Sequence, residues 1–198
     1  MEAEPASFLP RPLRIIVIGA GISGIQFARD VSTRLTNVEL CIYDKNKEEG
    51  GTWAENRYPG WNPNPEWTRP HAQAAEILRY LKSTVKKHNL GQYFRFNVRC
   101  TGAVWLQDEN VWNVTLETVD EPCTTFEEHC DVFVSALGRT NNWKLPDIPG
   151  LSRFTGPVLH TANWPPGFDC RGKDVAIIGN GASALQCLAA IEQGCFVI

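Results

Sequence analysis

The sequence predicts an α/β fold in which a strand, a glycine-rich turn, a helix and a second strand follow one another twice along 198 residues. In the first copy, an apolar, β-branched run at 14–18 is typical of a buried parallel strand, 22–35 has helical spacing, and 38–43 is a second strand. The second copy occupies 174–198. Because parallel strands need a crossover between them, each copy is expected to form one βαβ unit.

The second copy has a strand at 174–178, a helix at 182–193 and the start of another strand at 195–198. Since the chain ends within that strand, we expect the second domain to be shortened. The first domain is assigned to residues 1–150, as a parallel sheet with a β-hairpin insertion. Residues 151–198 are assigned to the start of the second domain.

Several elements are expected between the two copies. They are a Gly-, Pro-, Asn- and Trp-rich loop at 48–70, a helix at 72–88, a strand at 93–98, a hairpin joining 103–107 to 111–118, a strand at 131–136, and an irregular stretch at 140–172. The irregular stretch contains several prolines and is interpreted as the crossing between the two domains.

Composition argues against several classes of protein. The net charge of -3 and the isoelectric point of about 5.8 give no electrostatic basis for binding nucleic acid. The seven cysteines are irregularly spaced and lack a C-x-x-C pair, which favours reduced cysteines in a cytoplasmic protein over a disulfide framework or a zinc site. The sequence has no apolar run of signal-peptide type and none of about 18 residues, so we expect no membrane span.

The first glycine motif, Gly19-Ala20-Gly21-Ile22-Ser23-Gly24, lies between the first strand and the first helix. Gly19 permits a tight turn, Gly21 lets a pyrophosphate approach the backbone, and Gly24 lets the helix pack closely on the sheet. The pyrophosphate would lie at the helix N-terminus, near about half a positive charge. Asp44 ends the second strand, where a carboxylate accepts a hydrogen bond from a ribose hydroxyl. The context favours a dinucleotide site over a glycine turn of another α/β domain.

A second glycine motif, Gly179-Asn180-Gly181-Ala182-Ser183-Ala184, follows the strand at 174–178. Ala184 replaces the last glycine with another small residue, which the motif accepts. Two motifs indicate either two dinucleotides or one site and a decayed copy. The residue that distinguishes NAD from NADP would follow the next strand, beyond Ile198, so the motif leaves that choice open.

Two further motifs are candidates for a site. Gly50-Gly51-Thr52-Trp53, followed by Asn56-Arg57-Tyr58-Pro59-Gly60, is either a structural turn or a segment that wraps a flavin, with Trp53 and Tyr58 as flat apolar surfaces. The fourth motif contains Phe154, Gly156, His160 and Trp164-Pro165. A histidine in such a loop is more often structural than catalytic, since its imidazole can brace the loop through backbone hydrogen bonds. Its position between the two glycine motifs makes His160 a candidate catalytic residue.

Together the four motifs resemble the class B flavoprotein monooxygenases, specifically the Baeyer–Villiger type. That family has a glycine fingerprint, then G-G-T-W with N-R-Y-P-G, then F-x-G-x-x-x-H-x-x-x-W-P, and then a second fingerprint. This sequence has all four in the same order, and 141–150 is also similar to the family's segment before the histidine motif. The histidine motif distinguishes this type from the flavin-dependent N- and S-oxygenases, which remain the alternative.

The resemblance implies a Rossmann-like FAD-binding domain followed by a Rossmann-like NADP-binding domain. It also implies that NADPH reduces FAD, and that the reduced flavin uses O₂ to convert a ketone into an ester or lactone. The residues implied to hold FAD are Gly19, Gly21, Ile22, Ser23, Gly24, Asp44, Gly51, Thr52, Trp53, Ala54, Glu55 and Tyr58. Those implied to hold the NADP pyrophosphate are Asn180, Gly181, Ala182, Ser183, Ala184, Leu185 and Gln186. His160 is implied to lie at the domain hinge and to coordinate NADP movement.

Three departures from the family pattern bear on activity. The family has a segment with a Cys-Asp pair and a Tyr after Y-P-G, whereas here Gly60 runs almost directly into Trp61-Asn62-Pro63. Ala136-Leu137-Gly138 replaces A-T-G, and the segment with the family's active-site arginine would follow Ile198. We therefore expect a shortened, impaired monooxygenase, with a fragment that binds FAD weakly at most as a further alternative. The family suggests a secondary-metabolite ketone, but no residue identifies the substrate.

Overall fold

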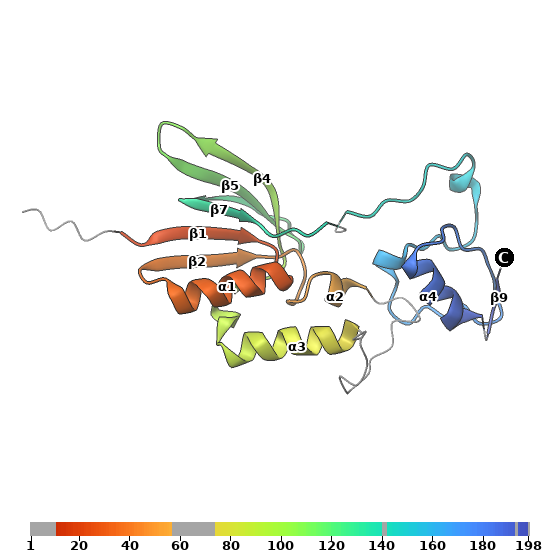
Figure 1. Ribbon diagram of the computed structural model, residues 1–198. Coiled ribbons are helices and arrows are strands. Elements are labelled where there is room, and N and C mark those ends of the chain that lie inside the picture. The colour runs from red at the N-terminus through yellow and green to blue at the C-terminus, as the bar shows by residue number, and fades with distance from the viewer. Residues whose placement is uncertain (1–10, 57–73, 140–141, 193, 198) are drawn as a thin grey trace, which may run out of the picture. The chain divides into compact units, whose positions relative to one another are not determined.

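A computed structural model describes residues 11–56, 74–139, 142–192 and 194–197 (Figure 1). The chain divides into two compact units. The first comprises the chain up to Glu48 together with His88–Leu137, and the second comprises Glu49–Lys87 together with the chain from Gly138 onward. Both units draw on two separate stretches of sequence, so long-range packing defines each of them.

A four-stranded parallel sheet forms the centre of the first unit. Its strands, in spatial order, are β3 (Phe94–Arg95), β2 (Val38–Tyr43), β1 (Leu13–Ile18) and β7 (Val132–Ser135). Helix α1 (Ile22–Arg34) connects β1 to β2 and covers one face of the sheet (Figure 1). The predicted βαβ unit is therefore confirmed, and the central strand β1 is buried from Ile15 to Ile18.

Helix α1 packs on the sheet through one apolar stripe. Its buried residues Gly24, Ile25, Ala28 and Val31 recur at the three- and four-residue spacing of one helical face. Ile42 of β2 lies beneath this stripe and is fully buried. Because of this close packing, the N-terminus of α1 lies against the loop that follows β1.

The other face of the parallel sheet packs against an antiparallel sheet. That sheet has the order β4 (Val98–Leu106), β5 (Val111–Thr118) and β6 (Thr125–Cys130). The core between the two sheets consists of Ile16, Ile18, Tyr43, Val114, Leu116 and Cys130. The hairpin of β4 and β5 was predicted, whereas β6 was missed, because the acidic Glu127-Glu128 pair interrupts its apolar alternation.

The second unit combines the 14-residue helix α3 with shorter elements and a small core. Its helices are α2 (Thr52–Glu55), α3 (Ala74–Lys87), α4 (Ala182–Ile191) and the 3₁₀ turns η2 (Leu151–Arg153) and η3 (Thr161–Asn163). Strands β8 (Asp174–Val175) and β9 (Phe196–Val197) pair in parallel across α4. The predicted second βαβ order is thus present, although β8 ends three residues earlier than expected. The loop predicted at 48–70 contains α2.

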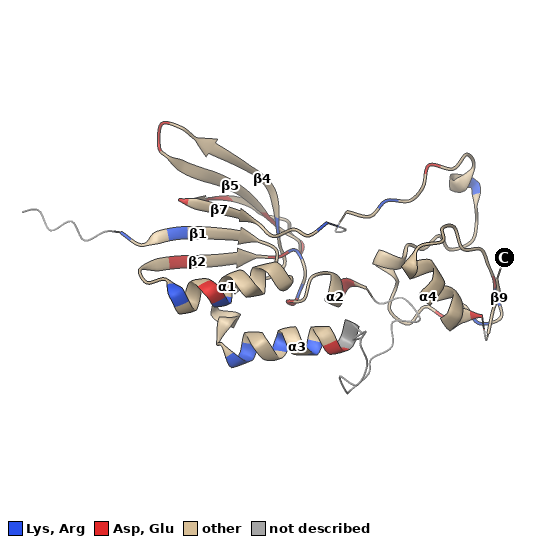
Figure 2. Cartoon of the chain, in the orientation of Figure 1, with Lys and Arg blue, Asp and Glu red and all other residues tan. Residues whose placement is uncertain are grey.

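Charges on α3 follow the helix dipole. Glu76 lies in the first turn, and Lys86 and Lys87 lie in the last (Figure 2). Negative charge near the positive helix N-terminus and positive charge near the C-terminus both stabilise the helix. In the part of the chain that the structure describes, none of the helices is long and apolar enough to cross a membrane.

Candidate functional site

The first glycine loop turns sharply out of β1. Gly19 has φ +114°, a conformation that favours glycine, and its amide donates to the Tyr43 carbonyl at 2.8 Å. A Cβ atom on Gly19 would collide with the Ala136 carbonyl at the end of β7. A Cβ atom on Gly24 would collide with the Gly19 carbonyl in the same way. The loop therefore requires glycine at both positions, as the motif predicts.

The start of α1 is open to solvent and carries no acidic side chain. Gly21 is the N-cap, with an extended conformation (φ −77°, ψ −168°) and no side-chain capping bond. Ile22 and Ser23 are exposed, and the first turn contains neither Asp nor Glu. Backbone amides at such a helix N-terminus attract an anion through hydrogen bonds and the helix dipole. The geometry fits a phosphate group at Gly21.

Asp44 follows β2 directly and has a second role that the sequence did not reveal. Its Oδ2 accepts a hydrogen bond from the Ala20 amide at 2.6 Å, and its Oδ1 accepts one from the Asn46 amide at 2.8 Å. The side chain is buried beside the glycine loop. Because each carboxylate oxygen has two lone pairs, both oxygens retain one for a hydroxyl donor. Asp44 thus holds the loop in shape and remains able to accept a hydrogen bond from a sugar.

The glycine pair at 50–51 is a structural requirement of the second unit. Gly50 and Gly51 have φ +126° and +56°, and a Cβ atom on Gly50 would collide with Leu78 of α3. The turn leads into α2, where the Trp53 amide donates to the Gly50 carbonyl at 3.1 Å and Ala54 is buried. Thr52 and Glu55 complete this short helix. Tyr58 lies outside the described residues.

The second glycine loop repeats the backbone conformation of the first. Gly179 has φ +117°, close to the +114° of Gly19. Gly181, the N-cap of α4, has φ −76° and ψ 174°, close to the values of Gly21. The first turn of α4 also lacks an acidic residue, and Asn180 and Ala182 are exposed. The local conditions for a phosphate group therefore occur twice in the chain.

The remaining residues predicted for the second loop lie at the start of α4. Ser183 and Ala184 are half-buried, while Leu185 and Gln186 are exposed. Cβ atoms on Gly179 and Gly181 would meet nothing within 4 Å. The first loop differs, because the end of β7 lies against Gly19 there.

His160 braces its own loop, as expected for a structural histidine. Its Nδ1 accepts a hydrogen bond from the Ala162 amide at 3.1 Å, which caps the 3₁₀ turn η3. Its ring stacks on Trp143, with a centroid separation of 5.1 Å and an interplanar angle of 21°. The sequence identified His160 but contained no indication of Trp143 as its neighbour.

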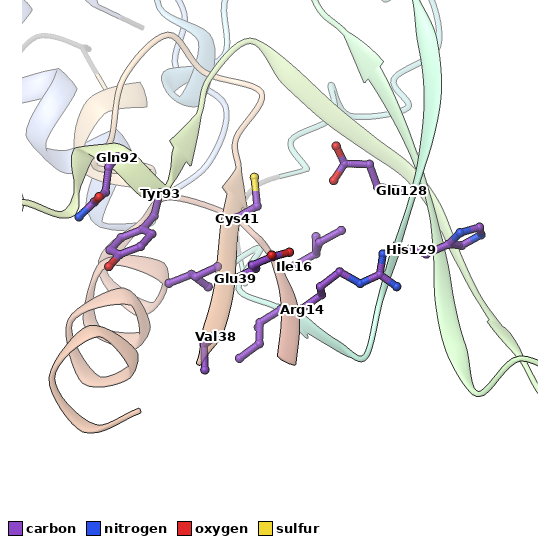
Figure 3. A pocket seen from close by; sticks show the side chains of 11 residues that line it. Arg14, Ile16, Val38, Glu39, Cys41, Gln92, Tyr93, Glu128 and His129 are labelled. Atoms are coloured by element: carbon purple, nitrogen blue, oxygen red, sulfur yellow. The ribbon is translucent and has the colours of Figure 1, made fainter. Parts of the chain in front are cut away.

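A cavity of about 330 Å³ lies at the opposite end of the parallel strands from the first glycine loop (Figure 3). Arg14 and Glu39, near the beginnings of β1 and β2, line it together with Glu128 of β6. Glu128 and His129 point to opposite sides of their strand, as successive strand residues do. In open parallel sheets, ligands bind beyond the carboxyl ends of the strands, so this cavity is separate from the dinucleotide site.

The described residues contain no cluster of three or more His, Cys, Asp or Glu side chains that could hold a metal ion. Burial raises the pKa of the Cys41 thiol beside the cavity, and this stabilises its protonated form. The raised pKa argues against a reactive thiolate at Cys41.

Comparison with known proteins agrees with the loop geometry. Residues 17–82 match the family model of an NAD(P)-binding Rossmann-like domain. The FAD-binding monooxygenase tazF of Aspergillus terreus is 37% identical, over 97% of this chain and 36% of its own length. A Baeyer-Villiger monooxygenase of Streptomyces coelicolor is 34% identical, over 91% of this chain and 36% of its own.

A solved structure of a monooxygenase is also similar to this chain. The chain superposes on cyclohexanone monooxygenase from Rhodococcus sp. Phi1 bound to NADP⁺ with a TM-score of 0.77 and 32% identity. The alignment covers 93% of this chain and 37% of that one. Over more than nine-tenths of its own length, this chain is similar to part of FAD-binding and Baeyer–Villiger monooxygenases. The chain spans about a third of the length of these relatives.

Proposed function

We propose that this chain supplies the FAD-binding part and the beginning of the NADP-binding part of a Baeyer–Villiger monooxygenase, which inserts one oxygen atom of O₂ into a ketone. The main support for the proposal is that the loops at Gly19–Gly21 and Gly179–Gly181 have the same backbone conformation. Two anion-binding helix N-termini in one chain fit two dinucleotides. The two domains assigned from the sequence, 1–150 and 151–198, each contain one of these loops.

The first loop would hold the pyrophosphate of FAD. Amides at the start of α1 donate to the phosphate oxygens, and Gly21 leaves room for the group to approach the backbone. Asp44, whose two oxygens each retain a lone pair, accepts from a ribose hydroxyl. For Thr52–Glu55 of the G-G-T-W segment and for Tyr58, we also propose a role in binding FAD, on the basis of the motif resemblance. When bound, FAD supplies the chemistry that activates O₂.

The second loop would hold the pyrophosphate of NADPH, with Asn180, Gly181 and the first turn of α4 as donors. His160 lies in the same unit. It would donate a hydrogen bond to the nicotinamide dinucleotide while that dinucleotide moves. The proposed partners are a small ketone and O₂, and the proposed location is the cytoplasm. Because the chain spans about a third of its relatives, we propose that it has little monooxygenase activity alone.

Reconstitution with FAD tests the first site. The purified chain is incubated with FAD, freed of excess cofactor and assayed for bound flavin by absorbance. Gly21→Val should abolish retention of FAD, since the valine side chain would occupy the space of the pyrophosphate. Gly91→Val is the matched control, because a Cβ atom on Gly91 meets nothing within 4 Å. Unchanged flavin content in Gly21→Val would refute this placement of FAD.

Oxygen consumption tests the activity. With FAD, NADPH and cyclohexanone present, we expect little or no NADPH-dependent oxygen uptake from the 198-residue chain. Robust formation of a lactone would show that the chain is a complete catalyst. Oxygenation of an amine or a sulfide without oxidation of a ketone would favour the N- or S-oxygenase alternative.

A further inference from the structure

We propose that Trp143 is a positioning residue for His160: the indole face and the Ala162 amide together hold the imidazole in one tautomer and one orientation, with Nε2–H as its available donor. The geometry of the free chain supports the first part of this inference. The second part, that this donor serves an oxygen acceptor of the nicotinamide dinucleotide, rests on the proposed function.

The tautomer follows from the hydrogen bond at Nδ1. The Ala162 amide donates to Nδ1 at 3.1 Å, and a nitrogen that accepts a hydrogen bond cannot also carry a proton. The proton of the neutral ring therefore lies on Nε2. Protonation at Nδ1, or a change to the other tautomer, would break this bond and remove the cap of η3.

The ring orientation follows from the stack. A hydrogen bond at Nδ1 alone leaves the imidazole some freedom to rotate about its Cβ–Cγ bond, because hydrogen bonds tolerate a range of angles. The Trp143 indole lies nearly parallel to the imidazole, 5.1 Å between centroids and 21° between planes, and removes that freedom. Two contacts of different kinds thus fix the direction of the Nε2–H bond.

The position of Trp143 is not explained by core packing. Its side chain is 41% exposed, and it does not belong to the apolar cluster around Cys170 and Ile191. The intervening segment turns back on itself, with the Leu151 amide donating to the Ile148 carbonyl at 3.0 Å. This turn brings an exposed indole against a histidine 17 residues later in the chain. The ring contact that Trp143 makes among the described residues is the stack on His160.

The orientation suits a hydrogen bond to the dinucleotide. A neutral imidazole with a fixed Nε2–H donates to an oxygen, such as a phosphate, hydroxyl or carboxamide oxygen, without bringing a net charge. Because the direction of the donor is set before binding, less side-chain freedom is lost when the ligand arrives. His160 is thus the residue that donates the hydrogen bond, and Trp143 orients the imidazole of His160.

The test of positioning uses the full chain without nucleotide. Long-range ¹H–¹⁵N spectra of the imidazoles report the tautomer of each of the four histidines, and His160→Gln identifies the signals of His160. We expect the Nε2–H tautomer and an upfield ring-current shift of the His160 protons in the native chain. Trp143→Phe should keep both features, whereas Trp143→Ala should lose the shift and allow both tautomers. Trp105→Phe, an indole of the other unit, should change neither.

Binding of NADP⁺ tests the ligand. Trp143→Ala should raise the Kd for NADP⁺ by roughly two- to tenfold, the size of one aromatic pair, while Trp143→Phe restores most of the affinity. In a chain that already carries His160→Gln, the further substitution Trp143→Ala should leave the Kd unchanged. Unchanged His160 spectra in Trp143→Ala would overturn the positioning role. Altered spectra with an unchanged Kd would leave Trp143 as a positioning residue and refute the dinucleotide as the acceptor.

Discussion

The Oδ2 atom of Asp44 accepts a hydrogen bond from the Ala20 amide at 2.6 Å, which joins the end of β2 to the glycine loop that follows β1. The same carboxylate accepts a bond from the Asn46 amide through Oδ1. Asp44 thus links two adjacent loops at the carboxyl edge of the parallel sheet. The residue expected to bind a ribose is also part of the structure that shapes the phosphate-binding loop.

Replacement of Asp44 should consequently affect folding as well as binding. Asp44→Ala leaves the buried Ala20 amide without its acceptor, so we expect a loss of about 1.5–3 kcal/mol in the free energy of unfolding. FAD retention should fall further than this destabilisation explains, because the ribose acceptor is lost too. Urea unfolding monitored by circular dichroism measures the first effect, and bound flavin measures the second. Asp108→Ala, in an exposed turn, should change neither.

The packing of the two sheets makes a separate prediction. Leu116 of β5 is fully buried in the core between the parallel and antiparallel sheets. Leu116→Ala should cost about 2–5 kcal/mol in the free energy of unfolding, through lost apolar burial and the cavity left behind. Val104→Ala, on β4 and 63% exposed, is the control and should cost far less. Equal effects of the two substitutions on urea unfolding would contradict the packing of β5 on the parallel sheet.

Asp131 predicts a pH dependence of stability. Its carboxylate accepts two hydrogen bonds from Arg11, at 2.6 and 2.7 Å, and one from the Arg14 amide at 2.8 Å. The hydrogen bond from Arg11, opposed by partial burial, lowers the pKa of Asp131 to about 2 from its ordinary 3.8. Because the folded state lowers this pKa, the stabilisation is present above pH 3.8 and is lost as the pH falls toward 2.

The measurement compares Asp131→Asn with the native chain. Urea unfolding between about pH 5 and pH 2 should show a smaller decline in stability for Asp131→Asn, since that side chain does not titrate. Asp169→Asn is the control. Its partner Arg171 also lowers the pKa of Asp169 to about 2, but both side chains of that pair are exposed to water, which screens their interaction. An identical pH profile for the native chain and Asp131→Asn would exclude a contribution from this carboxylate.

Local patterns in the sequence were enough to predict the two βαβ orders. The β-branched run of β1, the helical spacing of α1 and the glycines at 19 and 179 each depend on residues close in sequence. Strand β6 escaped prediction because Glu128 occupies a position on the strand face that packs toward the parallel sheet. Glu128 lies there near Tyr43 of β2, a residue 85 positions away in the sequence.

The sequence by itself determined the fold class, the two glycine loops and the resemblance to Baeyer–Villiger monooxygenases, because turn chemistry, periodicity and motif order depend on residues that are close in sequence. Only the tertiary structure decided which residues support the first glycine loop and the loop that contains His160. The bond from Ala20 to Asp44 and the stack of Trp143 on His160 join residues that are distant along the chain. Such contacts depend on how strands and turns pack in space, which a one-dimensional pattern does not contain.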